Sequence, residues 1–345
     1  MSSSVAFGLI GAGGIAQTYL QVFTGLDRGH IAAVADVRPE AAASVAETMG
    51  CRAFHSSEAM ADEAELDAVL ICTPPATHAE IAMQFLTKGV AVLCEKPLAL
   101  DLGAARELAS ASEANGTMLT MASKFRYVQD VIRAKSIFAS GILGEVIQFE
   151  NVFASRAEMT HRWNVDPAIS GGGVLIDNGT HSVDIVRYFL GPIEEILAVE
   201  GRRVQTLAVE DTVQLFVRAA GGARATIDLS WTLDKGRDTY IEIYGSNGTV
   251  RVGWNESKYR QANSRDWVGF GSGYNKIDAM RAQVENFCRA LHGEEGLLIT
   301  MEDAIASVGV IEQAYSSLAS SRWIRVSDGT PVQPRVDMRP GRVSA

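Results

Sequence analysis

Short, continuous apolar runs alternate with helix-like stretches over the first third of the chain. Runs without polar alternation are typical of strands that are covered on both faces. The strands expected from this pattern are Val5–Ile10, Ile31–Ala35, Ala68–Ile71, Val90–Leu93 and Met118–Met121. The helices expected between them are Ile15–Phe23, Glu40–Met49, His78–Lys88 and Leu102–Ala114, the last with Asp101 as N-cap and Gly116 beyond its end. The alternation predicts a parallel sheet with crossover helices.

The pattern changes from about Gly144 onward, where several longer strands alternate apolar and polar residues. This alternation indicates an antiparallel sheet with one covered face. The expected strands are Val146–Phe153, Glu195–Val204, Thr212–Arg218, Ala223–Trp231 and Tyr240–Tyr244, with hairpin turns at Gly221-Gly222 and Asn247-Gly248. The expected helices are Val174–Leu190, Ile277–Leu291 and Met301–Ser320.

We therefore predict an α/β protein of two domains. Residues 1–123 form a dinucleotide-binding Rossmann domain with a doubly wound parallel sheet. Residues 124–329 form an α/β domain with a large, open, mainly antiparallel sheet. Residues 330–345 contain three prolines and few apolar residues, and we expect an extended tail there.

Composition limits the function classes. With 345 residues, 47% of them hydrophobic and 21% charged, the chain resembles an ordinary globular protein. A formal net charge of -10 argues against a broad nucleic-acid surface. The sequence shows neither an export signal nor an apolar run of about 20 residues, so we expect a cytoplasmic protein without membrane contact. The scattered cysteines favour reduced thiols and no metal site; they are Cys51, Cys72, Cys94 and Cys288.

A glycine-rich turn, G-x-G-x-x-A, directly follows the first expected strand and opens a helix. Gly11 permits the tight turn, Gly13 lets the backbone approach a pyrophosphate, and Ala16 allows close packing of helix on strand. The N–H groups at the start of the helix, around Gly14 and Ile15, then face the phosphates. The pattern in this position predicts a dinucleotide site.

Asp36 ends the second expected strand, at the spacing expected for the carboxylate that binds the adenosine ribose. Because a carboxylate accepts hydrogen bonds from a ribose diol and repels a 2′-phosphate, Asp36 favours NAD over NADP. Arg38 lies two residues later and could stack on the adenine or meet a 2′-phosphate, so NADP remains open.

Two further motifs stand at strand ends, where ligands of doubly wound sheets bind. The first contains Thr73 and Pro74, which we expect to line the cofactor, and His78, for which a packing role is favoured over acid–base chemistry. The second is Glu95-Lys96-Pro97. A lysine that emerges from an apolar strand needs a cleft or a partner, and Pro97 restrains it by a fixed turn or by a cis bond.

A triple glycine, Gly171–Gly173, leads into the helix Val174–Leu190, which carries Asp177, Asn178 and His181. The spacing of four residues between Asp177 and His181 places both on one face, so that they can address a single substrate. Asp184 falls near the same side and is expected to cap or pack.

These four motifs together resemble the Gfo/Idh/MocA family of oxidoreductases, with a Rossmann fingerprint, E-K-P and G-G-G-x-x-x-D-x-x-x-H in the same order. Phe125-Arg126-Tyr127 also looks like the family, and the resemblance covers roughly Val5 to Val326. Ala16 replaces the last glycine of the fingerprint. The resemblance implies reversible oxidation of secondary alcohols on sugars, amino sugars, nucleotide sugars or cyclitols by NAD, or by NADP.

Carried over by position, Lys96, Asp177 and His181 become the catalytic group. His181 removes the hydroxyl proton, Lys96 stabilises the developing alkoxide, and Asp177 holds a neighbouring hydroxyl or orients the imidazole. Lys96 could instead be the acid–base group. The other substrate-binding candidates are Lys124, Arg126, Arg162, Trp163 and Asn178; the other residues assigned to the cofactor are Glu95 and His78.

Two other functions stay open at this point. One is a glycosidase that oxidises its substrate transiently with bound NAD, and the other is a non-catalytic sensor or subunit that binds the cofactor. A sensor has little need for a lysine, an aspartate and a histidine together. Because an open sheet face is a liability for a monomer, we expect a homodimer or homotetramer.

Overall fold

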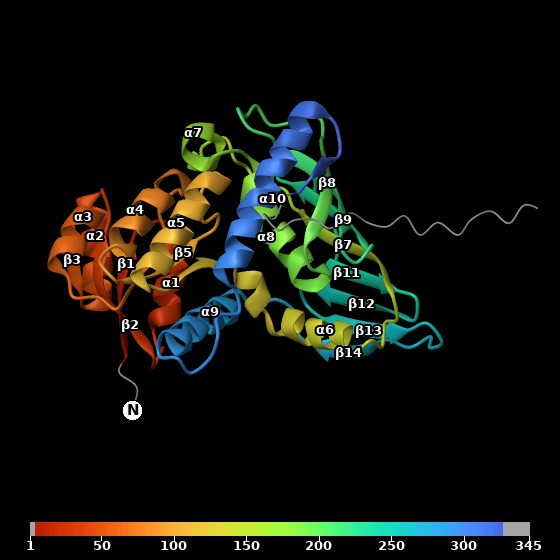
Figure 1. Cartoon of the computed structure of the whole chain (residues 1–345), viewed down its shortest axis with the longest axis horizontal. Helices are drawn as coiled ribbons and strands as arrows, with labels where there is room; N and C mark the ends of the chain where they lie inside the picture. Colours follow the sequence, from red (N-terminus) through yellow and green to blue (C-terminus); the bar gives the residue numbers. More distant parts are fainter. Residues whose placement is uncertain (1–3, 327–345) are drawn as a thin grey trace, which may run out of the picture.

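Two β-sheets make up most of the part of the chain that the structure describes, residues 4–326 of a computed structural model. The first sheet lies at the left of Figure 1, near the N-terminus, and the second lies at the right. Helices α8 and α10 run between the two sheets in this view (Figure 1).

The first sheet has six parallel strands in the order β3-β2-β1-β4-β5-β6. They are β1 (Val5–Ile10), β2 (Gly29–Ala35), β3 (Arg52–Phe54), β4 (Ala68–Ile71), β5 (Ala91–Glu95) and β6 (Leu119–Ala122). The five expected strands are confirmed, and β3 adds a short edge strand whose first two residues are exposed. The strand order reverses between β1 and β4, and ligands bind beyond the carboxyl ends of strands at such a point.

Five helices accompany this sheet. They are α1 (Gly14–Phe23), α2 (Pro39–Met49), α3 (Ser57–Glu63), α4 (His78–Leu86) and α5 (Leu102–Asn115). Two of them, α3 and α5, begin at a side-chain N-cap. The N-cap Asp101 accepts a hydrogen bond from the Ala104 amide at 2.9 Å, and Gly116 ends α5 in the left-handed conformation, as expected. The short α3 was not expected from the sequence; Ser56 caps it by accepting from the Ala59 amide.

The second sheet has nine strands in the order β14-β13-β12-β11-β7-β10-β9-β8-β15. All neighbours are antiparallel except β7 and β10, which confirms the mainly antiparallel sheet. The strands are β7 (Val146–Ala154), β8 (Ile193–Glu200), β9 (Thr212–Ala219), β10 (Arg224–Ser230), β11 (Thr239–Gly245), β12 (Gly248–Gly253), β13 (Ser257–Gln261), β14 (Val268–Gly271) and β15 (Ile324–Arg325).

Two details of this sheet correct the expectation. The strand expected over Glu195–Val204 ends at Glu200, because the amide of Val204 donates to the Asp211 carboxylate at 3.1 Å instead of to a neighbouring strand. Gly245 pairs with Gly248, so the two turn residues of this hairpin are Ser246 and Asn247 rather than Asn247 and Gly248.

Three helices cover one face of the second sheet: α6 (Gln129–Ala139), α8 (Val174–Leu190) and α10 (Met301–Ser320). A short helix, α7 (Pro167–Ser170), lies beside the first domain in the residue 155–170 loop. Along β9, Val213, Leu215 and Val217 are buried on the covered face while the residues between them are more exposed. The opposite face carries no helix in the described part of the chain (Figure 1).

Helix α9 (Lys276–Leu291) returns to the first domain, although it follows the second sheet in sequence. Met280, Val284 and Phe287 are buried in the core around β1, where the ring of Phe287 lies 5.8 Å from that of Phe7. We propose the domain division at residues 123 and 124, with α9 fastening the second domain to the first. The expected tail, 330–345, lies outside the described residues.

The remaining features concern thiols and membranes. All four cysteines are free, and Cys72, Cys94 and Cys288 are buried, as expected for reduced thiols in apolar surroundings. Among residues 4–326, no helix combines the length and the apolar character needed to cross a membrane.

Candidate active site

The glycine turn after β1 leaves open space at the start of α1. Gly11 has a φ of +88°, and a Cβ there would lie 2.9 Å from the carbonyl carbon of Cys72, so the turn requires glycine. A Cβ on Gly13 or Gly14 would meet nothing within 4 Å. Since α1 begins without a side-chain cap, its first N–H groups are left for a ligand. The turn therefore fits the pyrophosphate of a dinucleotide, and Ile15 lines the same cavity.

Asp36 follows β2 and is held as an ionised acceptor. Its Oδ2 accepts from the Ala12 amide at 2.7 Å, and its Oδ1 accepts from the amide and the Nε of Arg38 at 2.9 and 3.1 Å. Burial acts to raise the pKa of Asp36, but these hydrogen bonds outweigh it, so the pKa lies below its ordinary value. Because the guanidinium of Arg38 is engaged by this carboxylate, the arrangement favours a ribose diol over a 2′-phosphate.

The loop after β4 brings Thr73 and Pro74 to the cavity, whereas His78 does not reach it. His78 is buried, with Nδ1 2.7 Å from the Pro97 carbonyl oxygen and Nε2 2.8 Å from the Thr73 carbonyl oxygen. Burial lowers the pKa of this imidazole. The assignment of His78 to the cofactor is therefore corrected: the ring is buried between two loops, and as a neutral imidazole it donates its single N–H to one of these two carbonyls.

Lys96 meets Asp177 across the two domains. The bond between Lys96 and Pro97 is cis. The Lys96 ammonium forms an ion pair with the Asp177 carboxylate and donates to the Asp177 carbonyl oxygen at 3.0 Å. Glu95 lies beside it and accepts from the Tyr19 hydroxyl at 2.9 Å. A strand end of the first sheet and the first turn of α8 are thus joined at one point of the cavity.

His181 lies one turn further along α8 and also lines this cavity. Its Nε2 is 3.2 Å from the Lys124 ammonium, and its Nδ1 is buried with no hydrogen-bond partner in residues 4–326. Since an ammonium can only donate, Lys124 selects the tautomer whose lone pair is on Nε2. Burial, and then the charges of Lys124 and Lys96, hold the pKa of His181 well below its ordinary value, so the imidazole is neutral.

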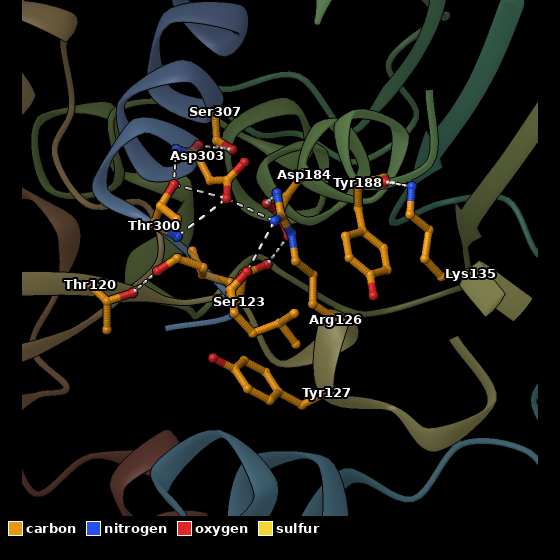
Figure 2. Close-up of polar contacts among 12 residues, drawn as sticks. Thr120, Ser123, Arg126, Tyr127, Lys135, Asp184, Tyr188, Thr300, Asp303 and Ser307 are labelled. Carbon is orange, nitrogen blue, oxygen red and sulfur yellow. Dashed lines mark hydrogen bonds and ion pairs between the residues drawn. The ribbon is translucent and has the colours of Figure 1, made fainter. Parts of the chain in front are cut away.

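Arg126 does not reach the cavity, which corrects its assignment as a substrate contact. Its side chain is only 4% exposed. Figure 2 shows the guanidinium between Asp184 of α8 and Asp303 of α10, which lie 2.6 and 2.9 Å from its nitrogens. Ser123 donates to the same Asp184 carboxylate at 2.8 Å. The network ties α8, which carries Asp177 and His181, to the strand end of β6.

The other expected substrate residues, Arg162, Trp163 and Asn178, line the cavity, whose volume is about 1350 Å³. The Trp163 side chain belongs to the loop over residues 155–170 and is 46% exposed. Sequence reasoning missed lining residues that stand outside any motif; they are Phe153, Asp234, Arg237, Trp254, Tyr274 and Lys276. Only the pairing of β7 and β11 and the return of α9 bring them there, and no sequence signal marks them.

Comparison with known proteins gives consistent matches over the length of the chain. Residues 5–123 match the model described as "Oxidoreductase family, NAD-binding Rossmann fold", and residues 131–251 match the "GFO/IDH/MocA C-terminal domain". An inositol 2-dehydrogenase of Rhizobium meliloti (strain 1021) is 27% identical over 342 residues, which are 94% of this chain and 100% of the relative.

Solved structures agree with these matches. The crystal structure of GenD2 from gentamicin A biosynthesis, in complex with NAD, has a TM-score of 0.83 at 27% identity and covers 94% of this chain and 97% of its own. Levoglucosan dehydrogenase in complex with NADH has a TM-score of 0.87 at 20% identity, covers 94% and 99% of the two chains, and shows the shared fold.

Proposed function

This chain belongs to the Gfo/Idh/MocA family of NAD-binding oxidoreductases, and from that premise we propose that it oxidises a secondary alcohol of a sugar, amino sugar, nucleotide sugar or cyclitol, or reduces the matching ketone. One observation carries the proposal: Lys96, Asp177 and His181 meet in the same cavity as the glycine turn and Asp36. When bound there, NAD supplies the hydride acceptor. Gly13 and Gly14 would face its phosphates and Asp36 its adenosine ribose.

His181 is the proton acceptor in this proposal. The neutral imidazole presents the lone pair of Nε2 toward the cavity, and a substrate hydroxyl that donates to this nitrogen loses its proton as the carbinol carbon loses hydride. Nδ1 is buried, so Nε2 is the ring nitrogen that a ligand can reach. The T-shaped contact with Phe125, at 5.1 Å between ring centroids, keeps the imidazole in this orientation.

Lys96 supports the developing negative charge on the same oxygen. Its ammonium already donates to Asp177, so it is suited to donate to an alkoxide rather than to remove a proton. Asp177 holds this ammonium and keeps a second oxygen for a neighbouring hydroxyl of the substrate. This division assigns the acid–base role to His181, and the lysine stabilises charge.

Absorbance of reduced nicotinamide tests the proposal, with NAD and then NADP, across cyclitols, free sugars, amino sugars and nucleotide sugars. We expect NADH from at least one substrate class. His181→Asn should lower kcat by about 10²- to 10⁴-fold with an unchanged Kd for NAD, because the base is lost and the glycine turn is untouched. His55→Asn, at an exposed histidine outside the cavity, is the matched control and should keep full activity.

Near-normal turnover in His181→Asn would refute the assignment of the base. The dehydrogenase itself would be refuted if no substrate class yields NADH while glycosides are hydrolysed. It would also be refuted if the cofactor binds and no substrate class yields NADH.

We also propose that the chain forms a homodimer or homotetramer through the helix-free face of the second sheet. Leu197 of β8 and Phe216 of β9 are paired across that face, and Val199 beside them is 47% exposed. A second copy would remove this apolar surface from water. Sedimentation that shows only monomer at micromolar concentration would contradict this proposal.

A further inference from the structure

Lys124 holds an ammonium at the catalytic end of the cavity without a carboxylate partner. It lies in the short 3₁₀ helix Lys124–Tyr127 and contacts the His181 ring nitrogen at 3.2 Å and the face of Phe125 at 5.0 Å. No carboxylate within residues 4–326 forms an ion pair with it. An ammonium that is withdrawn from water without an anion is costly, unless the working complex supplies one.

The carboxylates nearby are already engaged. Asp177 pairs with Lys96, and Glu95 accepts from the Tyr19 hydroxyl and from the Lys96 amide. Lys276 adds another cation, whose ammonium donates to the Thr18 hydroxyl at 3.1 Å. The charged and titratable groups around Lys124 are therefore Glu95, Lys96, Asp177, His181 and Lys276. Desolvation first, and then the balance of these charges, lowers the pKa of Lys124 to about 8.

Catalysis would take from Lys124 the ring nitrogen that it contacts. A substrate hydroxyl that donates to Nε2 of His181 takes the lone pair that now accepts from Lys124. Once His181 has accepted the proton, two adjacent cations repel each other. A negative charge on the substrate would give the ammonium a new partner and would relieve that repulsion.

We propose that the substrate carries an anionic group beside the reacting carbinol, and that Lys124 binds this group. The inference rests on the proposed function, since it places the hydroxyl on His181. Because the Lys124 ammonium is 3.2 Å from the base, the anionic group belongs within about two carbons of the carbinol, judged from hydrogen-bond lengths. A carboxylate meets this requirement in aldonates and uronates. Lys124 is thus a specificity-determining residue for sugar acids.

The pyrophosphate of NAD does not fulfil this role. It is expected at the start of α1, over Gly13 and Gly14, whereas Lys124 borders His181 and Phe125. Substitution of Lys124 should therefore change substrate preference while the Kd for NAD stays the same.

The test compares matched pairs of substrates: gluconate with glucose, galacturonate with galactose, and glucose 6-phosphate as the phosphate arm. The readout is the ratio of kcat/KM for the acid to that for its neutral partner, because a general effect on His181 cancels in this ratio. Lys124→Met should reduce the ratio about 10- to 100-fold, mainly through KM of the acid, as for a lost hydrogen bond to a charged group. Lys124→Arg should retain the preference. Lys88→Met, at an exposed lysine paired with Asp62, is the control and should leave the ratio unchanged.

Binding of gluconate and galacturonate to the enzyme with NADH, followed by nicotinamide fluorescence, separates this inference from the proposed function. Acids that bind in a Lys124-dependent manner without any turnover would support the anion site and refute the dehydrogenase. Turnover that prefers neutral sugars, or a ratio that Lys124→Met does not move, would overturn the anion site and leave the dehydrogenase standing. A preference confined to glucose 6-phosphate would overturn the carboxylate assignment.

Discussion

Replacing Arg126 by methionine removes the cation that pairs with both Asp184 and Asp303 (Figure 2). The Asp184 side chain is 0% exposed, and after the substitution its remaining partner within residues 4–326 is the Ser123 hydroxyl, at 2.8 Å. Asp303 loses the same partner but is nearer to solvent and keeps its hydrogen bonds to Thr300. The energetic cost therefore falls mainly on Asp184.

Protonation sets the upper limit of this cost. A carboxylate buried without a cation can take up a proton instead. An ordinary aspartate has a pKa near 3.9, so pH 7 lies about three pH units above it. Protonation at pH 7 costs about 1.4 kcal/mol for each of these units, or about 4 kcal/mol in all. Burial already raises the pKa of Asp184 in the intact protein, although Arg126 and Ser123 oppose it, so part of this cost is present before the change. We expect Arg126→Met to lower the free energy of unfolding by about 2–4 kcal/mol at about pH 7.

The sign of the pH dependence follows from the raised pKa. In the folded variant the pKa of Asp184 lies above its value in the unfolded chain. The penalty is therefore absent below the unfolded pKa near 3.9 and grows as the pH rises. At about pH 5 it should be no more than about 1.5 kcal/mol.

Urea unfolding followed by tryptophan fluorescence measures the loss at both pH values. Asp184→Asn combined with Arg126→Met removes the buried carboxylate together with the cation and leaves only Asp303, so it should greatly reduce the pH-dependent part. A loss below about 1 kcal/mol, or an equal loss at both pH values, would refute the reasoning. A KM within threefold of the parent, in the fraction that folds, would agree with the position of Arg126 outside the cavity.

Three further outcomes follow from the site. Gly11→Ala should weaken NAD binding more than tenfold, measured by fluorescence titration, because the new Cβ would meet the Cys72 carbonyl. The control is Gly50→Ala, at a φ of +65° with open space around it, which should leave NAD binding unchanged. Asp36→Asn should reduce the preference for NAD over NADP about tenfold in the ratio of Kd values, since a charge is lost beside the ribose. For gluconate, KM should rise about tenfold per pH unit above about pH 8, where Lys124 loses its proton, whereas KM for a neutral sugar should not rise. The same pH profile of KM for gluconate and for the neutral sugar would contradict this.

The fold could be predicted where local pattern and long-range packing agree. The strands of the first sheet are continuous apolar runs because both faces are covered, and each was found with its end close to the expected residue. Elements without such a signal were missed: β3 is a three-residue edge strand, and α6 is a short helix with a strongly mixed composition. The place of α9 could not be predicted from its own residues; the burial of Met280, Val284 and Phe287 in the core around β1 assigns it to the first domain.

The candidate site likewise contains residues that could be predicted from the sequence and residues that could not. Residues fixed by backbone geometry could be predicted, because Gly11, Asp36 and Lys96 follow the parallel strands β1, β2 and β5, whose carboxyl ends lie at one edge of the sheet. Asp177 and His181 could be predicted from their spacing on one helix. Tyr274 and Lys276 could not, because their approach depends on how the second sheet and α9 close over the first domain.

The two corrected assignments share a physical cause that also explains Lys124. His78 and Arg126 are polar residues inside motifs, and both side chains are buried against acceptors of the protein itself: backbone carbonyls for His78 and two carboxylates for Arg126. Lys124 lies only two residues from Arg126, yet it contacts a neutral ring nitrogen where a buried cation requires an anion. A sequence gives the type of a residue but not its set of partners. Residues whose partners are complete hold the site together, and a residue whose set is incomplete is where a ligand is required.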